Sequence, residues 1–326
     1  MSKSVLSAKH FHDEEAAYSY LEKRVWPNGP VCPHCGGFER ISKMQGKATR
    51  IGLYKCYQCR KQFRVTVKTV FEASHVPLHI WLQAVALLTS SKKGISSNQL
   101  HRTLGVTLKT AWFMSHRIRL AMQDGRFSSM MGGGGGVVEV DETFIGKVEG
   151  APKKFMGWGF KNSVLTLVER GGASRTFHVD GHASADLWPI LRANIAPDAR
   201  VMTDDGRWYI GLNKHFPTHE TVRHKDKEYA RGDVHTNSVE GYFSIFKRGM
   251  KGVYQHCSER HLHRYLAEFN FRYSNRVNLG VDDAMRADLV SPSRGAACRD
   301  TPSGLGRGLA RPAPPLGAEP GCARCA

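Results

Sequence analysis

Three carboxylates in the second half of the chain have the types and the order that phosphodiester chemistry requires. Asp141 follows the apolar positions of VVEVD, Asp204 ends the apolar stretch RVMTD, and thirty-five residues separate Asp204 from Glu240. Hard divalent cations such as Mg²⁺ prefer carboxylate oxygens and bind phosphate oxygens with their remaining positions. Two such ions can activate a water or a 3′-hydroxyl and stabilise the leaving oxygen of an in-line displacement. These residues are therefore candidate ligands of a catalytic pair of Mg²⁺ or Mn²⁺ ions.

Each carboxylate also has an ordinary structural interpretation. Asn237 and Glu240 fit a helix N-cap followed by a capping-box glutamate, a stabilising device without catalytic meaning. The stretch 204–206 alone would be a turn, and Asp141 alone would be the solvated end of a strand. The order and spacing of all three carboxylates favour the metal-binding interpretation.

Two basic residues follow Glu240 on the same expected helix. Lys247 and Arg248 lie about two turns further on, where they can meet a phosphate. Asn237 offers a carbonyl oxygen to an ion but no charge, so Glu240 is the first choice for the third ligand and Asn237 the second. Weaker substitutes are Asp205 for Asp204, and Glu139 or Glu142 for Asp141.

The elements that must position these residues follow one another in a characteristic order. Apolar runs and alternation predict strands, and helical spacing predicts helices. Strands are expected at 137–146, 162–170, 174–181, 200–205 and 219–224, and helices at 184–195, 207–216 and 234–252. A long basic helix is expected over 258–276. Three strands, helix, strand, helix, strand, helix is the order of an RNase H-like domain, a mixed-sheet α/β fold.

Two C-x-x-C pairs near the N-terminus indicate a zinc ribbon. Cys32 and Cys35 are separated by twenty residues from Cys56 and Cys59, a spacing within the range of structural zinc sites. Each two-residue gap lets both sulfurs turn toward one tetrahedral Zn²⁺. The alternative, four unrelated reduced cysteines, has to explain two matched pairs by chance. His34 is expected to face solvent, because four sulfurs already complete the site.

The segment after Pro77 predicts three helices, the last two joined like a helix-turn-helix. A glycine-containing turn ends at Thr107, a good helix cap. On the helix that follows, one face is apolar and the opposite face carries Lys109, Phe113, His116 and Arg117. A basic face of this kind can read DNA. The alternative is an ordinary three-helix bundle whose polar face is merely solvated.

Composition favours a polyanionic partner. The 326 residues contain 47 Lys and Arg against 29 Asp and Glu, giving a net charge of +18 and a calculated pI near 9.7. Basic surfaces bind nucleic acid through release of counterions from phosphates. No apolar run is long enough to cross a membrane and no export signal is evident. We expect a cytoplasmic, nucleoid-associated protein.

A run of glycines at 132–136 is expected to be a flexible hinge, and the C-terminus is rich in Gly, Pro, Ala and Arg and is expected to be disordered. A third C-x-x-C, Cys322 to Cys325, has no second pair beside it and is not expected to bind metal. The expected parts are an N-terminal segment with the zinc ribbon (1–75), the helix-turn-helix region (76–124), a Gly-rich linker (125–136), the RNase H-like domain (137–289) and the tail (290–326).

Taken together, these motifs make the chain resemble bacterial insertion-sequence transposases of the ISXO-like group, which combine a zinc ribbon, a helix-turn-helix and a DDE-type RNase H-like domain. The order of all the matching blocks agrees over roughly residues 10 to 289. The blocks are CPHC at 32–35, YKC at 54–56, SKKGISSNQL, KTAWFMSHRIRLAM, VEVDETFIGK, Thr203-Asp204, HTNSVEGYFSIFKRGMKG and HLHRYLAEFNFRYSNR.

The resemblance implies cleavage at inverted-repeat transposon ends and transfer of the freed 3′-hydroxyls into target DNA. Asp141, Asp204 and Glu240 would hold the ions, and Lys247 would contact DNA near the scissile phosphate. Members of the group are described with either Glu or Asn as the third residue, which keeps Asn237 open. Two transposon ends must be paired, which implies a homo-oligomer on DNA. After Leu289 the resemblance gives way to the tail, which would suit a frameshifted or truncated copy.

Two other functions fit parts of this pattern. One is a catalytically inactive, transposase-derived protein that binds DNA as a repressor or architectural factor, and the intact set of carboxylates argues against it. The other is a stand-alone RNase H-like nuclease or junction resolvase. Strand joining would separate a transposase from such a nuclease, which uses only water as its nucleophile.

Overall fold

The computed structural model describes residues 4–123, 129–150, 160–181, 183–226, 228 and 230–290. The described residues all belong to one compact unit. Most of the expected tail, with Cys322 and Cys325, lies outside the described residues, as do residue 124 and residues 125–128 of the expected linker. Within the described part of the chain, no helix is long and apolar enough to span a membrane.

The zinc ribbon is a small antiparallel sheet preceded by a helix. The helix is α1 (Glu14–Val25), and the strands are β1 (Ile41–Lys43), β2 (Tyr54–Cys56) and β3 (Gln62–Phe63). Trp26 sets its ring edge-on against the rings of Tyr54 and Phe63, 5.3 and 5.7 Å between centroids. This aromatic contact gives a very small sheet an apolar core.

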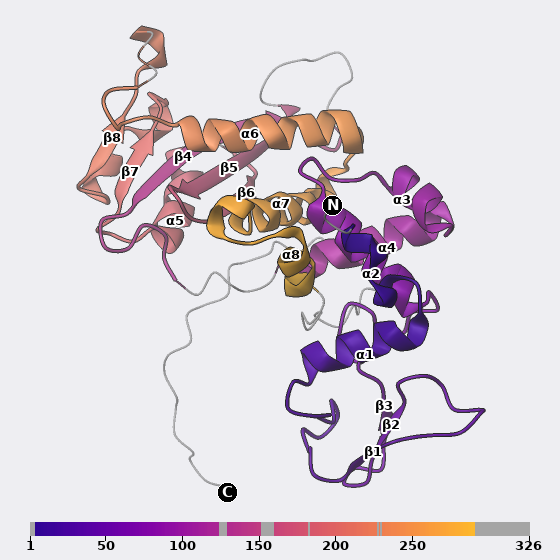
Figure 1. The fold of residues 1–326 in the computed structure, drawn as a ribbon. Helices are drawn as coiled ribbons and strands as arrows, with labels where there is room; N and C mark the ends of the chain where they lie inside the picture. The colour runs from indigo at the N-terminus through magenta and orange to yellow at the C-terminus, as the bar shows by residue number, and fades with distance from the viewer. Residues whose placement is uncertain are drawn as a thin grey trace, which may run out of the picture. The chain divides into compact units, whose positions relative to one another are not determined.

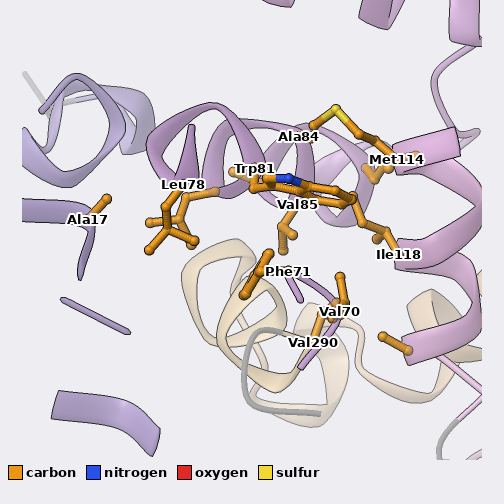
Figure 2. Packing of buried hydrophobic residues seen from close by; sticks show 14 of the residues in the cluster. Ala17, Val70, Phe71, Leu78, Trp81, Ala84, Val85, Met114, Ile118 and Val290 are labelled. Atoms are coloured by element: carbon orange, nitrogen blue, oxygen red, sulfur yellow. The ribbon is translucent and has the colours of Figure 1, made fainter. Parts of the chain in front are cut away.

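Three helices form the core of the expected helix-turn-helix region. They are α2 (Leu78–Ser90), α3 (Ser97–Leu104) and α4 (Leu108–Ala121). Gly105 has a left-handed backbone (φ 65°) and the Thr107 side chain accepts a hydrogen bond from the Thr110 amide, as the turn and the cap predicted. Figure 2 shows Trp81 among Val70, Val85 and Ile118, with Val290 of the last helix, α8 (Asp283–Val290), beside them.

The larger sheet has five strands in the order β6-β5-β4-β7-β8. Strand β5 pairs antiparallel with both β4 and β6, whereas β7 pairs parallel with β4 and β8 pairs parallel with β7. This mixed order is the one expected for an RNase H-like domain. The bounds are β4 (Val137–Ile145), β5 (Asn162–Glu169), β6 (Ser174–Val179), β7 (Arg200–Thr203) and β8 (His219–Thr221).

Separate hydrophobic clusters pack on the two faces of the sheet. On one face Val138, Val140 and Leu165 pack with α5 (Ser184–Asn194) and the turns after β7. On the other face Val164 and Val168 pack with α6 (Asn237–Gly249) and α7 (Glu259–Ser274). Figure 1 shows α6 running along the sheet, with its start near β7 and β4. A π-helical turn, Met250–Tyr254, extends α6.

The helix predicted over 207–216 is wrong in type, because the segment forms two 3₁₀ turns, Arg207–Tyr209 and Leu212–Lys214. A left-handed glycine, Gly211 (φ 88°), separates the two turns. Pro189 is the sixth residue of α5 and lies inside the helix. A proline inside a helix removes one backbone hydrogen bond but does not prevent a short helix that packs well.

The glycine run leads into β4 through hydrogen-bonded turns. The Gly132 amide donates to Glu169 (2.9 Å), the Gly134 amide to Asp198 (2.7 Å), and the Gly136 amide to the Gly132 carbonyl (2.8 Å). Glycines 132, 134 and 135 have positive φ, which other residues adopt at a cost. The run is thus ordered against the sheet at its β4 end.

A buried ion cluster joins α4 to α7. Glu268 is fully buried and accepts from Arg119 (2.6 Å), from Arg272 and from the Tyr254 hydroxyl (2.5 Å). Burial alone would raise the pKa of Glu268, but the two guanidinium groups lower it to about 2. The helix-turn-helix region and the sheet domain therefore share a charged contact that is costly to open.

Candidate active site

The register of the sheet brings Asp141 and Asp204 side by side. In the parallel pair of β4 and β7, Glu139 lies opposite Met202. Two residues further along are Asp141, which is still within β4, and Asp204, which lies one residue past the end of β7. Neighbouring strands are about 4.8 Å apart, and residues two apart share a face. The two aspartates therefore lie on neighbouring strands in the corner where the pairing of β4 with β7 ends, close enough for the charge of Asp204 to act on Asp141.

Glu240 reaches this corner from the first turns of α6, whose helix packs over β4 and β5. It is exposed, and its Oε1 accepts a hydrogen bond from the buried Thr236 hydroxyl (3.1 Å). The N-cap of α6 is Thr236, and Asn237 is the first helical residue. The expected capping box of Asn237 and Glu240 is therefore absent from this helix, because the helix starts one residue earlier than that interpretation requires.

The pKa of Asp141 indicates that the neighbouring carboxylates lie close to it. Burial raises the pKa of Asp141 well above its ordinary value, and the negative charges of Glu142, Asp204 and Glu240 raise it further. Bringing like charges together in a half-buried corner is unfavourable unless a cation or protons neutralise them. The donor set is all carboxylate oxygen, which is the chemistry that Mg²⁺ or Mn²⁺ prefers. These donors therefore have the chemistry, though not the preassembled geometry of the four ribbon sulfurs, for a divalent cation.

A fourth carboxylate, Glu142, belongs to this corner from the opposite face of β4. Its Oε2 accepts a hydrogen bond from the fully buried Tyr209 hydroxyl (2.6 Å). Burial raises the pKa of Glu142 to about 7, with the Tyr209 hydrogen bond opposing the rise and the charge of Asp204 adding to it. Nothing in the local sequence singles out Tyr209. Its place depends on the 3₁₀ turn that follows β7.

The other substitutes considered from the sequence have different partners. Asp205 pairs with Lys225, with 3.3 Å between Oδ2 and Nζ. Glu139 is fully buried and binds the start of α6 and Arg170. Asn237 is exposed at the first residue of α6, one helical turn before Glu240. Among the substitutes, Glu142 is the one whose charge acts on Asp141.

Lys247 and Arg248 lie exposed in the last turn of α6. Lys247 is seven residues after Glu240, which places it about 10 Å along the helix on nearly the same face. Its ammonium group lies 5.6 Å from the centroid of the Phe243 ring. The Arg248 guanidinium donates to the Ser244 carbonyl (3.0 Å). Both cations are available to a polyanion that passes the carboxylate corner.

The face of α4 that was predicted to read DNA is only partly exposed. Lys109 is exposed, as are Trp112 and Phe113, with 42% and 48% of their surfaces accessible. Arg117 is half-buried, donates to the Glu72 carbonyl (2.9 Å) and packs over the Phe113 ring. Phe113 was expected on this face from the sequence, whereas the exposed Trp112 was not.

His116 is a correction, because its side chain is only 2% exposed and does not lie on the open face of α4. Its ring packs against those of His261 and Tyr265 of α7. Burial lowers its pKa to about 3, with the positive charge of Arg119 adding to the effect, so the ring is neutral at pH 7. Helical periodicity on α4 alone could not show that α7 covers this position.

The four ribbon cysteines form a metal site. Their sulfurs all lie within 4.8 Å of one another, and two pairs, Cys32 with Cys59 and Cys35 with Cys56, are 3.6 and 3.7 Å apart. A tetrahedral zinc with bonds of about 2.3 Å needs sulfurs about 3.8 Å apart. The exposed His34 ring approaches the Gln62 carbonyl at 3.4 Å instead. The site fits a structural Zn²⁺ held by four sulfurs.

Comparison with known proteins agrees with this architecture. Residues 134–274 match the model of the ISXO2-like transposase domain, and residues 12–62 match the transposase zinc-ribbon domain. The chain is 28% identical over 284 residues to an uncharacterised protein in transposable element ISH50 of Halobacterium salinarum, covering 82% of this chain and 93% of that protein. It is also 28% identical over 92 residues to an uncharacterised transposase-like protein of Haemophilus influenzae, covering 28% and 73%.

A zinc ribbon followed by a helical region and a mixed-sheet RNase H-like domain with clustered carboxylates defines a DDE-type transposase. The chain belongs to the ISXO2-like transposases. This family supports a transposase, a DNA-cleaving enzyme in general terms.

Proposed function

We propose that Asp141, Asp204 and Glu240 hold two Mg²⁺ or Mn²⁺ ions at which this transposase cleaves DNA. The observation that carries the proposal is the convergence of the three carboxylates, from β4, the residue after β7 and the first turns of α6, where the charges of Asp204 and Glu240 raise the pKa of Asp141. When bound, the ions would polarise the scissile phosphate and activate the attacking oxygen. The substrate proposed for this chemistry is the inverted-repeat end of an insertion sequence.

The surrounding residues have supporting roles in this proposal. Tyr209 holds the Glu142 carboxyl at the edge of the corner by its 2.6 Å hydrogen bond. Lys247 and Arg248 bind phosphates of the duplex beside the scissile bond. Glu240 is exposed and Asp141 is partly exposed, so a phosphodiester can approach these carboxylates from solvent.

DNA recognition is proposed for the zinc ribbon and for α4. Lys109 and Arg117 supply charge on α4, and the exposed Trp112 and Phe113 rings offer apolar contacts to bases. His116 is left out of this set because α7 covers it. Phosphate contacts supply most of the affinity of such interfaces, so loss of the carboxylates should spare binding.

Strand transfer completes the proposed reaction. After cleavage, a freed 3′-hydroxyl attacks a phosphodiester of target DNA, so the P–O bond to one target nucleotide breaks while a bond to the transposon end forms. Two ends must be joined to one target, and we therefore propose a homo-oligomer assembled on DNA. Such a complex would act on the nucleoid.

The experiment that tests this function uses duplexes carrying the ends of the insertion sequence with Mg²⁺ or Mn²⁺. Asp204→Asn should lower cleavage and joining by at least about a thousandfold while changing DNA affinity less than about twofold. Glu240→Gln and Asn237→Ala are compared in the same assay. If Glu240→Gln loses cleavage and joining while Asn237→Ala keeps both, Glu240 is the third metal ligand. The reverse result makes Asn237 the third ligand.

Zinc-dependent DNA binding without any cleavage by the wild-type protein would contradict the proposal and leave a DNA-binding protein derived from a transposase. Cleavage without joining would instead indicate a nuclease. Full activity of Asp204→Asn would remove that residue from the site.

A further inference from the structure

Glu139 makes a set of contacts that the proposed chemistry does not use. It lies on β4 two residues before Asp141, on the same face, and is fully buried. Its Oε2 accepts from the backbone amides of Ser238 (2.7 Å) and Val239 (3.1 Å). Its Oε1 accepts from the Ser238 hydroxyl (3.0 Å) and from Arg170 Nε (2.6 Å).

These bonds satisfy donors that a helix leaves open. The first amides of an α-helix have no partner inside the helix, and the helix dipole favours a negative charge there. In α6 no side chain from the N-cap residue Thr236 fills this role. A carboxylate from the sheet does so instead, and the residue that follows the two bound amides is Glu240.

Arg170 extends the same contact to the chain that leads into α6. It follows β5 directly, and its Nη1 donates to the Asp233 carbonyl (2.7 Å) and its Nη2 to the His235 carbonyl (3.0 Å). The His235 ring lies 3.4 Å from Glu139 Oε1. Both sides of the α6 start, the incoming loop and the first turn, are thus fixed to the β4–β5 edge.

Glu139 itself has no capacity left for an ion. A carboxylate offers about four lone-pair positions, and four donors already occupy the two oxygens of Glu139. Its side chain is also sealed from solvent. A ligand role in place of Asp141, which the sequence alone left open, therefore does not fit this geometry.

We propose that Glu139 is a positioning residue, which fixes the start of α6 on β4 and thereby sets where Glu240 lies relative to Asp141. Arg170 supports it by holding the Asp233–His235 loop. The inference rests on the proposed function in so far as Glu240 binds the catalytic ions. The contact itself is independent of any ion and can be tested without one.

The first test is amide hydrogen exchange on the zinc-loaded protein without other divalent metal. First-turn amides usually exchange fast, but those of Ser238 and Val239 should be protected in the wild type. Glu139→Gln keeps the shape but turns a donor toward these amides, and their exchange should rise at least about tenfold. Leu187→Ala, in the core on the opposite face of the sheet, is the matched control for general destabilisation.

The second test is a double-mutant cycle on Mn²⁺ binding measured by titration calorimetry. Glu139→Gln should weaken Mn²⁺ binding by about tenfold, as loss of a contact that orients a ligand commonly does. In a Glu240→Gln background the same substitution should change affinity less than about twofold, because the residue it positions is no longer a ligand. If Glu139→Gln fails to fold, Glu139→Asp, which keeps the charge but reaches one methylene less, replaces it.

The outcomes separate the two proposals. Fast exchange of both amides in the wild type, or equal losses of Mn²⁺ affinity in the two backgrounds, would overturn the positioning role. A wild-type protein that binds no Mn²⁺ but protects both amides would contradict the proposed active site and leave the contact at the start of α6 in place. If the Ser238 and Val239 amides exchange as fast in Leu187→Ala as in Glu139→Gln, the faster exchange reflects a general loss of stability, and the positioning role is rejected.

Discussion

Glu142→Gln is expected to stabilise the metal-free sheet domain at neutral pH and to leave its stability unchanged at low pH. Glutamine has the same shape, still accepts the Tyr209 hydrogen bond and carries no charge. In the wild type, burial raises the pKa of Glu142 from 4.5 to about 7. Below pH 4.5 the carboxyl is protonated in both the folded and unfolded states, and the two proteins behave alike.

The direction in which the stability of the wild type changes with pH follows from the number of protons that each state binds. Between pH 4.5 and 7 the folded state holds a proton that the unfolded state releases, so the free energy of unfolding of the wild type falls as pH rises. A change from 4.5 to about 7 corresponds to about 3 kcal/mol, at about 1.4 kcal/mol for each pH unit. Glu142→Gln should therefore be more stable by about 3 kcal/mol at pH 8, or by about 6–12 °C in the melting temperature of a domain of this size.

The assay is thermal unfolding of both proteins between pH 4.5 and 8, with zinc bound and other divalent metals removed. The difference between the two proteins cancels the contributions of other groups. Adding Mn²⁺ should reduce the difference in stability between Glu142→Gln and the wild type, because ion binding favours the ionised carboxyl of the wild type. Parallel curves over the whole pH range would refute the reasoning and show that Glu142 is not held in a costly environment.

Three further outcomes are expected. Removing zinc, or Cys56→Ser, should unfold residues near 30–67 and weaken DNA binding without shifting the melting of the sheet domain; unchanged affinity would reject the role of the ribbon. Lys247→Ala should reduce the slope of log affinity against log salt by about 1, and an unaltered slope would make it an ordinary surface lysine. Glu268→Gln should cost about 3–5 kcal/mol because two buried guanidinium groups lose their counter-charge, and a loss below about 1 kcal/mol in urea unfolding would contradict this. Tyr254→Phe, the milder control, should cost about 1–2 kcal/mol.

The sequence predicted most of the sheet because its strands have clear local patterns. The apolar positions of β4 and β7 are buried, and each aspartate follows such a run, so their meeting at a sheet edge could be expected. The zinc ribbon could also be predicted from a local pattern, since the two-residue gaps in its cysteine pairs let both sulfurs of each pair turn toward one ion. In both places the decisive interaction lies within a few residues or in one strand pair.

The failures involve partners far away in the sequence. His116 shares a helix face with Lys109, and its burial depends on α7, about 150 residues later. The start of α6 fits a capping box by sequence, but its amides bind Glu139 about 100 residues earlier. The turns after β7 read as a helix because their apolar residues have helical spacing, yet Gly211 interrupts them. Contacts between residues so far apart in the sequence cannot be predicted from a pattern of a few neighbouring residues.

The packing of α8 has a consequence for synthesis of the chain. Val290 completes the core formed by Val70 and Trp81, and Arg286 donates to the Thr89 carbonyl at the end of α2. The ribosome delivers these residues only after the whole sheet domain has been made. The N-terminal helices of a nascent chain therefore lack part of their core, and a transposase still on its ribosome should not yet hold α4 in the form proposed to bind DNA. Completion of the polypeptide would thus precede its first stable encounter with a transposon end.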